Sequence, residues 1–138
     1  MTATHTPGQT TETPRRAPQD FNQPTHHVSL DAECDGLLEE AGANPSRRAA
    51  KTLSKDPSMT VALLAMRGGA EIKDHRAHGS ALLQVIRGDV TVSLKAGHVS
   101  LSPGHVLALA SQVPHGLTTT VDSVVLLVVA ADQVTRTG

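Results

Sequence analysis

Residues 82–94, LLQVIRGDVTVSL, decide the fold of this chain. An apolar run leads into the pair Gly88-Asp89, and after that pair Val and Leu alternate with Thr and Ser. Alternation with a period of two is typical of a β-strand that has one face in water, and a Gly-Asp pair is typical of a turn. The stretch therefore predicts two strands joined by a glycine turn.

The same rhythm continues through most of the chain. From Ser58 onward, short apolar runs are separated by turn residues such as Gly and Pro, and the runs are residues 60–66, 82–86, 90–94, 98–101, 106–110 and 124–130. Many short strands separated by turns are typical of a β-sandwich or barrel. We therefore predict an all-β domain over residues 58–131, followed by a C-terminal tail at residues 132–138.

The part of the chain before this domain divides into two segments. Residues 1–28 hold half of the eight prolines and few apolar residues, so burial cannot offset the entropy of ordering them, and we predict a disordered tail. Residues 29–57 are predicted to form a helix and a lead-in strand. Ser29 suits the N-cap of the helix, Gly42 suits its end, and the apolar face comprises Leu30, Cys34, Leu37, Leu38 and Ala41.

Composition excludes several classes of partner. The net charge is −1, and the chain has no Trp, no Tyr and one Phe, so we expect no nucleic-acid partner. The longest apolar run, residues 124–131, is far shorter than the roughly 20 residues that span a bilayer, so we also expect no membrane partner. The N-terminal residues lack the pattern of a secretory signal, which predicts a cytoplasmic protein.

Histidines are the chemically suggestive feature of the β domain. Five of the eight lie between positions 75 and 115. Histidine is a common metal ligand and a proton-transfer group near neutral pH. One interpretation joins His75, His78 and His115 around one divalent transition metal, Zn, Ni, Fe or Cu, with positions left open for water or substrate. Because residues 75 and 78 face opposite sides of an ideal strand, His78 can join only if the chain bulges.

The other interpretation needs no metal. In it, His75 and His115 are polar groups in an aliphatic barrel pocket, where they contact a small-molecule ligand. Gln84 interrupts an apolar strand, and its amide either hydrogen-bonds within this pocket or faces solvent.

The glycines and histidines resemble the two motifs of the cupin superfamily. The first motif, G-x5-H-x-H-x3-4-E-x6-G, is matched by Gly69, His75 and Gly88, and the second, G-x5-P-x-G-x2-H-x3-N, is matched by Gly104 and His115. The resemblance covers roughly residues 58–131. It implies a cupin-type double-stranded β-helix, that is, a jelly-roll barrel.

The motifs also depart from the family pattern. Ala77 stands where the first motif has its second histidine, and Ala81 stands where it has its glutamate. In the second motif the replaced positions are Ala110 for proline, Gln112 for glycine and Thr119 for asparagine. Half of the ligand set that the resemblance implies is therefore absent.

Three functional hypotheses follow. The first is a small-molecule-binding cupin with a histidine-containing pocket. The second is a metal-dependent enzyme, an isomerase or oxygenase acting on a small polar metabolite, so enzymatic activity stays open. The third is a structural or regulatory dimerisation module. Because residues 124–129 are apolar on both strand faces, one face needs a cover, and we expect a homodimer, with the helix at residues 30–41 as the alternative cover.

Overall fold

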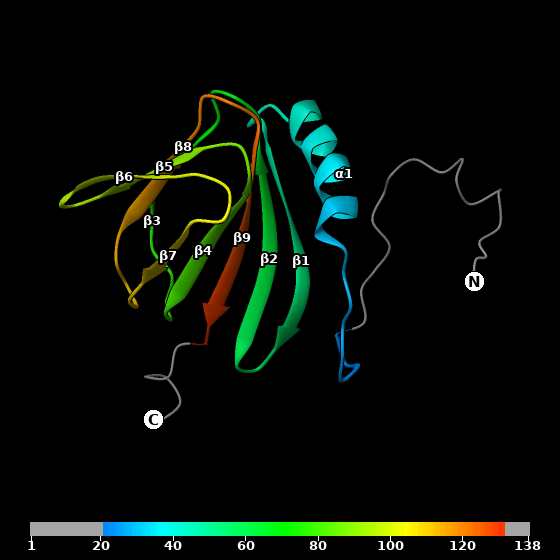
Figure 1. Cartoon of the computed structure of the whole chain (residues 1–138). Coiled ribbons are helices and arrows are strands. Elements are labelled where there is room, and N and C mark those ends of the chain that lie inside the picture. Colours follow the sequence, from blue (N-terminus) through cyan, green and yellow to red (C-terminus); the bar gives the residue numbers. More distant parts are fainter. Residues whose placement is uncertain (1–20, 132–138) are drawn as a thin grey trace.

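The structure is a computed structural model that describes residues 21–131. Within this range one helix precedes nine strands (Figure 1). The elements are α1 (Leu30–Ala43), β1 (Arg48–Asp56), β2 (Met59–Met66), β3 (Glu71–His75), β4 (Ala81–Arg87), β5 (Val90–Leu94), β6 (Gly97–Leu101), β7 (Val106–Leu109), β8 (His115–Thr118) and β9 (Ser123–Ala130). No helix of residues 21–131 is long and apolar enough to cross a lipid bilayer.

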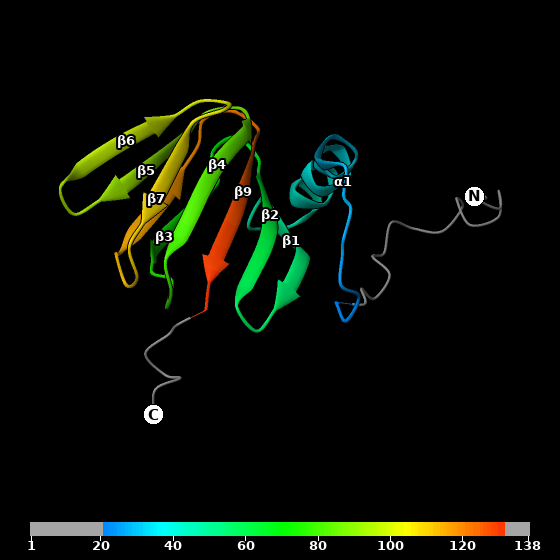
Figure 2. The ribbon, with the colours of Figure 1, turned by 60° about the horizontal axis from the view of Figure 1, so that its bottom comes forward.

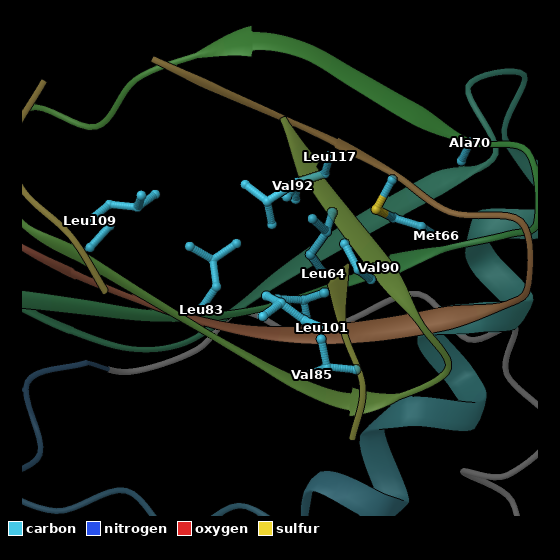
Figure 3. Packing of buried hydrophobic residues seen from close by; sticks show 12 residues of the cluster. Leu64, Met66, Ala70, Leu83, Val85, Val90, Val92, Leu101, Leu109 and Leu117 are labelled. Atoms are coloured by element: carbon cyan, nitrogen blue, oxygen red, sulfur yellow. The ribbon is translucent and has the colours of Figure 1, made fainter. Parts of the chain in front are cut away.

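Two antiparallel sheets enclose the core. The five-stranded sheet has the order β1-β2-β9-β4-β7, and the four-stranded sheet has the order β3-β8-β5-β6. Both sheets contribute to one buried aliphatic cluster, in which Leu64 and Leu83 from the first sheet meet Val92 and Leu117 from the second (Figure 3). The predicted all-β jelly-roll barrel is confirmed.

Strand alternation assigns the two faces of the five-stranded sheet. In β4, Ala81, Leu83 and Val85 belong to the core between the sheets, so Leu82 and Gln84 lie on the outer face. Helix α1 packs on part of this outer face beside β1 and β2 (Figure 2). Its buried residues Cys34, Leu37 and Ala41 form a second cluster with side chains that include Leu63, Ala65 and Val124.

Helix α1 begins where the sequence predicts and ends slightly later. The Ser29 hydroxyl accepts a hydrogen bond from the backbone N–H of Ala32 at 3.3 Å, which confirms the predicted N-cap. The helix continues through Gly42 to Ala43, and Asn44 is its C-cap. The predicted tail at residues 1–28 lies mostly outside the described residues, as does the predicted tail at residues 132–138. Val28, at the boundary, packs against the α1 cluster.

The runs of apolar residues in the sequence do not predict two of the strands, β3 and β8. In β3 the residues Glu71, Lys73 and His75 are exposed, so the strand shows no continuous apolar run. Strand β8 has only four residues, HGLT. Backbone pairing with neighbouring strands stabilises both: β3 pairs with β8, and β8 also pairs with β5. These two short strands carry His75 and His115.

A buried polar network holds the turns at one end of the barrel. The Thr119 hydroxyl lies 2.7 Å from the carbonyl oxygen of Asp89 and 2.8 Å from the Ser123 hydroxyl. The Ser123 hydroxyl also accepts the backbone N–H of Asp89 at 3.1 Å. Gly88 has φ +81°, and a Cβ added there would lie 2.2 Å from the Ser123 oxygen. We call this group, Gly88, Asp89, Thr119 and Ser123, the turn end.

Candidate functional site

His75 and His115 meet at the opposite end of the barrel because of a β-bulge. Ile72 pairs with Leu117 and His75 pairs with His115, so two residues separate the β3 partners where one separates the β8 partners. In a regular strand, residues 72 and 75 would face opposite sides of the sheet, but the extra residue of the bulge turns both side chains to the same side. Since Ile72 and Leu117 both contact the barrel core, the bulge places His75 on the same side as Ile72. We call His75, His115, Ala77, which follows β3, and Ala81, which begins β4, the histidine end.

The two imidazole rings form a perpendicular pair. Their centroids are 5.5 Å apart and their planes lie at 89°. His115 is only 8% exposed, whereas His75 is exposed to solvent. One ring of the pair therefore lies at the edge of the barrel interior, and the other lies in contact with solvent.

Hydrogen bonding fixes the tautomer of His115 when the ring is neutral. Its Nδ1 atom lies 3.0 Å from the carbonyl oxygen of Val113. A carbonyl oxygen can only accept, so Nδ1 carries the proton, and Nε2 of the neutral ring keeps its lone pair. Among the side chains that the structure describes, none hydrogen-bonds this Nε2 atom. His115 therefore offers one oriented acceptor at the edge of an aliphatic interior.

The structure does not bring His78 to this pair. The Nδ1 atom of His78 lies 3.2 Å from the amide nitrogen of Gln112, and its backbone carbonyl accepts the hydroxyl of Ser111. The backbone N–H of Gln112 also donates to the carbonyl of Ala77 at 2.9 Å. Residues 77 and 78 thus pack against the loop before β8, and the one bulge of β3 lies before His75, where it cannot turn His78 inward. The described part of the chain holds no group of three or more His, Cys, Asp or Glu side chains suited to a metal ion.

Ala77 and Ala81 explain why no ligand set forms. Ala81 is buried in the core cluster, and Ala77 packs against the same cluster. The positions that the resemblance gives to a histidine and a glutamate therefore do face the interior, but they carry methyl groups. Two imidazoles are fewer than the three protein ligands that catalytic zinc sites use. The described side chains do not fit a resident transition metal.

Gln84 lies away from the two histidines. It pairs with Leu126 of β9 and Val106 of β7 on the outer face of the five-stranded sheet. The neighbouring Leu83 and Val85 occupy the barrel interior, and alternation then directs residue 84 outward. The structure therefore places Gln84 on the outer face, the second of the two orientations considered above, and does not bring it to His75 and His115.

Cys34 takes no part in this site. It lies on the face of α1 that packs on the sheet and is fully buried, and burial raises the pKa of its thiol. A raised pKa keeps the sulfur protonated near neutral pH, and the thiol is a poor nucleophile compared with the thiolate. The predicted role of Cys34 as a buried helix residue is confirmed.

Comparison with solved structures identifies the fold. No family model and no curated protein matches the chain. Among solved structures, a cupin superfamily protein from Desulfitobacterium hafniense is similar with a TM-score of 0.59 and 15% identity, over 62% of this chain and 78% of that protein. KdgF from Halomonas sp. gives a TM-score of 0.57 and 21% identity, over 63% of this chain and 82% of KdgF.

A larger protein shares the fold as well. A salicylate 1,2-dioxygenase from Pseudaminobacter salicylatoxidans gives a TM-score of 0.66 and 19% identity, over 77% of this chain but 35% of the dioxygenase. The chain thus spans about a third of that protein. At these identities the likeness concerns the fold alone.

Proposed function

Because this chain has the cupin fold, we propose that it binds a small molecule at the histidine end of the barrel and that it does so without a resident metal ion. One observation carries the proposal. In the neutral ring of the buried His115, the contact of Nδ1 with the Val113 carbonyl leaves Nε2 as an acceptor, and no described side chain hydrogen-bonds it. An oriented polar atom without a partner in an apolar surrounding is a typical anchor for a small ligand.

The side chains of the histidine end and of Val113 define the ligand chemistry. Ala77, Ala81 and Val113 are small or aliphatic and contact the barrel core. A neutral imidazole Nε2 accepts a hydrogen bond, so the complementary ligand carries a hydroxyl or N–H donor on a compact apolar body. The exposed His75 ring stands at the edge of the site, where it can contact a polar substituent that remains in water.

Ala77 and Ala81 weigh against the metal-dependent enzyme. An isomerase or oxygenase with a bound metal needs ligands that these positions do not supply. The ring nitrogens of the histidine pair can still accept and donate a proton. No described group positions a reaction partner for it, so binding is the function that the site supports best.

The ligand test compares two histidine variants. Thermal shifts are measured for wild type, His115→Ala and His98→Ala against a set of small hydroxyl- and amide-bearing metabolites, each shift being taken relative to the melting temperature of the same variant. His98 is exposed on β6, so it serves as the matched control. A ligand should stabilise wild type and His98→Ala but not His115→Ala. Equal stabilisation of all three variants would contradict the assignment of the site.

A second measurement addresses the metal. Elemental analysis of protein purified without a nickel column should find far less than one transition-metal ion per chain. About one tightly bound ion per chain, lost in His115→Ala, would contradict the metal-free proposal. Long-range ¹H–¹⁵N spectra should also show the Nδ1–H tautomer for His115, because the Val113 carbonyl accepts that proton.

A further inference from the structure

The loop between β7 and β8 contains an unusual backbone conformation at Gln112. The backbone N–H of Val113 donates to the carbonyl oxygen of Ala110 at 3.3 Å, which closes a turn. Gln112 is the third residue of this turn and has φ +69°, a position where glycine or asparagine is preferred. Only one other non-glycine residue of the described chain, Arg47, has a positive φ. A glutamine in this conformation costs free energy, so its contacts must offset the cost.

The contacts that hold Gln112 come from the segment that follows β3. Its backbone N–H donates to the carbonyl oxygen of Ala77 at 2.9 Å. Its side-chain amide nitrogen lies 3.2 Å from Nδ1 of His78, and because an amide nitrogen only donates, the imidazole accepts. The hydroxyl of Ser111 donates to the backbone carbonyl of His78 as well. We call these three contacts the clasp.

One side of the clasp is fixed to the larger sheet. Gly79, next to His78, is buried, and a Cβ added to it would overlap the carbonyl oxygen of Ala130 at the end of β9. The backbone N–H of Ala130 also donates to the carbonyl oxygen of Ser80 at 2.9 Å. The segment that carries His78 therefore has little room to move, and the clasp holds the loop before β8 against it.

The other side of the clasp leads to His115. Val113 supplies the carbonyl oxygen that accepts the Nδ1 proton of the neutral ring. A residue before proline is restricted to extended conformations, so Pro114 leaves Val113 little freedom. The direction of this carbonyl group therefore depends mainly on the backbone of Gln112, which the clasp holds at a positive φ.

We infer that Gln112 is a positioning residue for the ligand site at the histidine end. Through its contact with His78 it holds the turn so that the Val113 carbonyl keeps the proton on Nδ1 of His115, which leaves Nε2 as the acceptor for a ligand. Gln112 acts through the turn and not by contact with the ligand. The inference rests on the proposed function, since the tautomer matters for binding only if Nε2 anchors a ligand.

The test measures the tautomer of His115 in the full chain without any ligand, by long-range ¹H–¹⁵N spectra at a pH high enough to keep the ring neutral. Gln112→Gly keeps the positive φ accessible but removes the side chain, and His78→Ala removes the acceptor. Each should lower the ratio of the Nδ1–H form to the Nε2–H form roughly five-fold, the effect of one net hydrogen bond. His78→Asn should restore the ratio, because its side-chain oxygen can accept the Gln112 amide.

Arg47→Gly is the matched control. It relieves the same kind of backbone strain at a distant turn, where the Arg47 guanidinium contacts the carbonyl oxygen of Gly68, and it should leave the His115 ratio unchanged. A thermal melt verifies that each variant is folded. An unchanged ratio in both Gln112→Gly and His78→Ala would overturn the inference and leave the proposed function intact, as would an equal change in Arg47→Gly. A wild-type ring with its proton mainly on Nε2 would overturn both.

Discussion

The turn end and the histidine end of the barrel differ in the kind of side chain that they bury. At the turn end, Thr119 and Ser123 are buried, and their hydroxyl groups hold the backbone of Asp89. At the histidine end, Ala77 and Ala81 fill interior positions with methyl groups. The comparison shows that the residues that close the barrel and the residues that would hold a metal occupy separate ends, so one set can change while the other maintains the fold.

The strongest test of this contrast is Gly88→Ala at the turn end. The positive φ of Gly88 disfavours any side chain, and a Cβ would lie 2.2 Å from the Ser123 hydroxyl and 2.4 Å from the carbonyl oxygen of Asp122. We expect the free energy of unfolding to fall by about 3 kcal/mol or more, because strain and overlap add. Urea denaturation measures the loss.

Gly104→Ala is the matched control for that experiment. Gly104 has φ +90°, and nothing lies within 4 Å of an added Cβ. It should therefore show only the conformational cost, about 1 kcal/mol. Equal losses in the two variants would mean that the close packing against Ser123 contributes nothing.

Restoring the missing ligands would test the histidine end. In Ala77→His/Ala81→Glu, two interior positions gain the side chains that the cupin resemblance implies. We expect about one Zn or Ni ion bound per chain, at a cost of about 1–3 kcal/mol in apo stability, because Ala81 lies in a packed core. Isothermal titration and elemental analysis provide the measurement.

The same double substitution in a His115→Ala background is its control, and it should bind metal much more weakly. If Ala77→His/Ala81→Glu binds no metal, the backbone at the histidine end does not bring the four side chains into the arrangement that a metal needs, and the missing side chains alone do not explain the lack of a ligand set. That result would remove the basis of the comparison.

Thr119→Val tests the polar network at smaller scale. Valine has nearly the shape of threonine but makes no hydrogen bond, so the carbonyl oxygen of Asp89 and the hydroxyl of Ser123 lose a buried partner. We expect a loss of about 1–2 kcal/mol in the free energy of unfolding. The adjacent Thr118 is exposed, and Thr118→Val should change stability by less than about 0.5 kcal/mol. A neutral Thr119→Val would show that the network is dispensable.

Asp122→Asn should have the smallest effect, and the effect should depend on pH. The backbone N–H of Gly68, followed by Arg67, lowers the pKa of the Asp122 carboxyl below its ordinary value of 3.8. A lowered folded-state pKa means that the ionised form stabilises the fold above the unfolded pKa and that this contribution is lost as pH falls through the folded pKa. Since Asp122 is about half exposed, the loss near neutral pH should be below about 1 kcal/mol.

Urea unfolding of wild type and Asp122→Asn provides the measurement. The difference between the two should be largest near pH 7 and should shrink as the pH falls well below 3.8. A difference that stays constant down to strongly acidic pH would show that the carboxylate is not responsible.

Sequence reasoning was most successful where local chemistry decides the structure. The turn at Gly88, the strands around it and the Ser29 cap follow from turn preference, alternation and helix capping. Both interpretations of the histidines group His75 with His115, but strand periodicity alone could not predict their contact, because it depends on one extra residue in β3 and on the pairing of two strands with little apolar signal. The orientation of Gln84 stayed open for a related reason: alternation separates two faces, and only the packing of the sheets decides which face is interior.

The position of β9 determines when this protein can fold. Strand β9 lies between β2 and β4, although it follows both in the chain by many residues. During synthesis, β2 and β4 therefore leave the ribosome with no partner between them and with unpaired edges that invite aggregation. Pairing across such sequence separation is also slow. The middle of the larger sheet is thus assembled only after its last strand emerges, which makes this barrel a candidate for chaperone assistance while it is being translated.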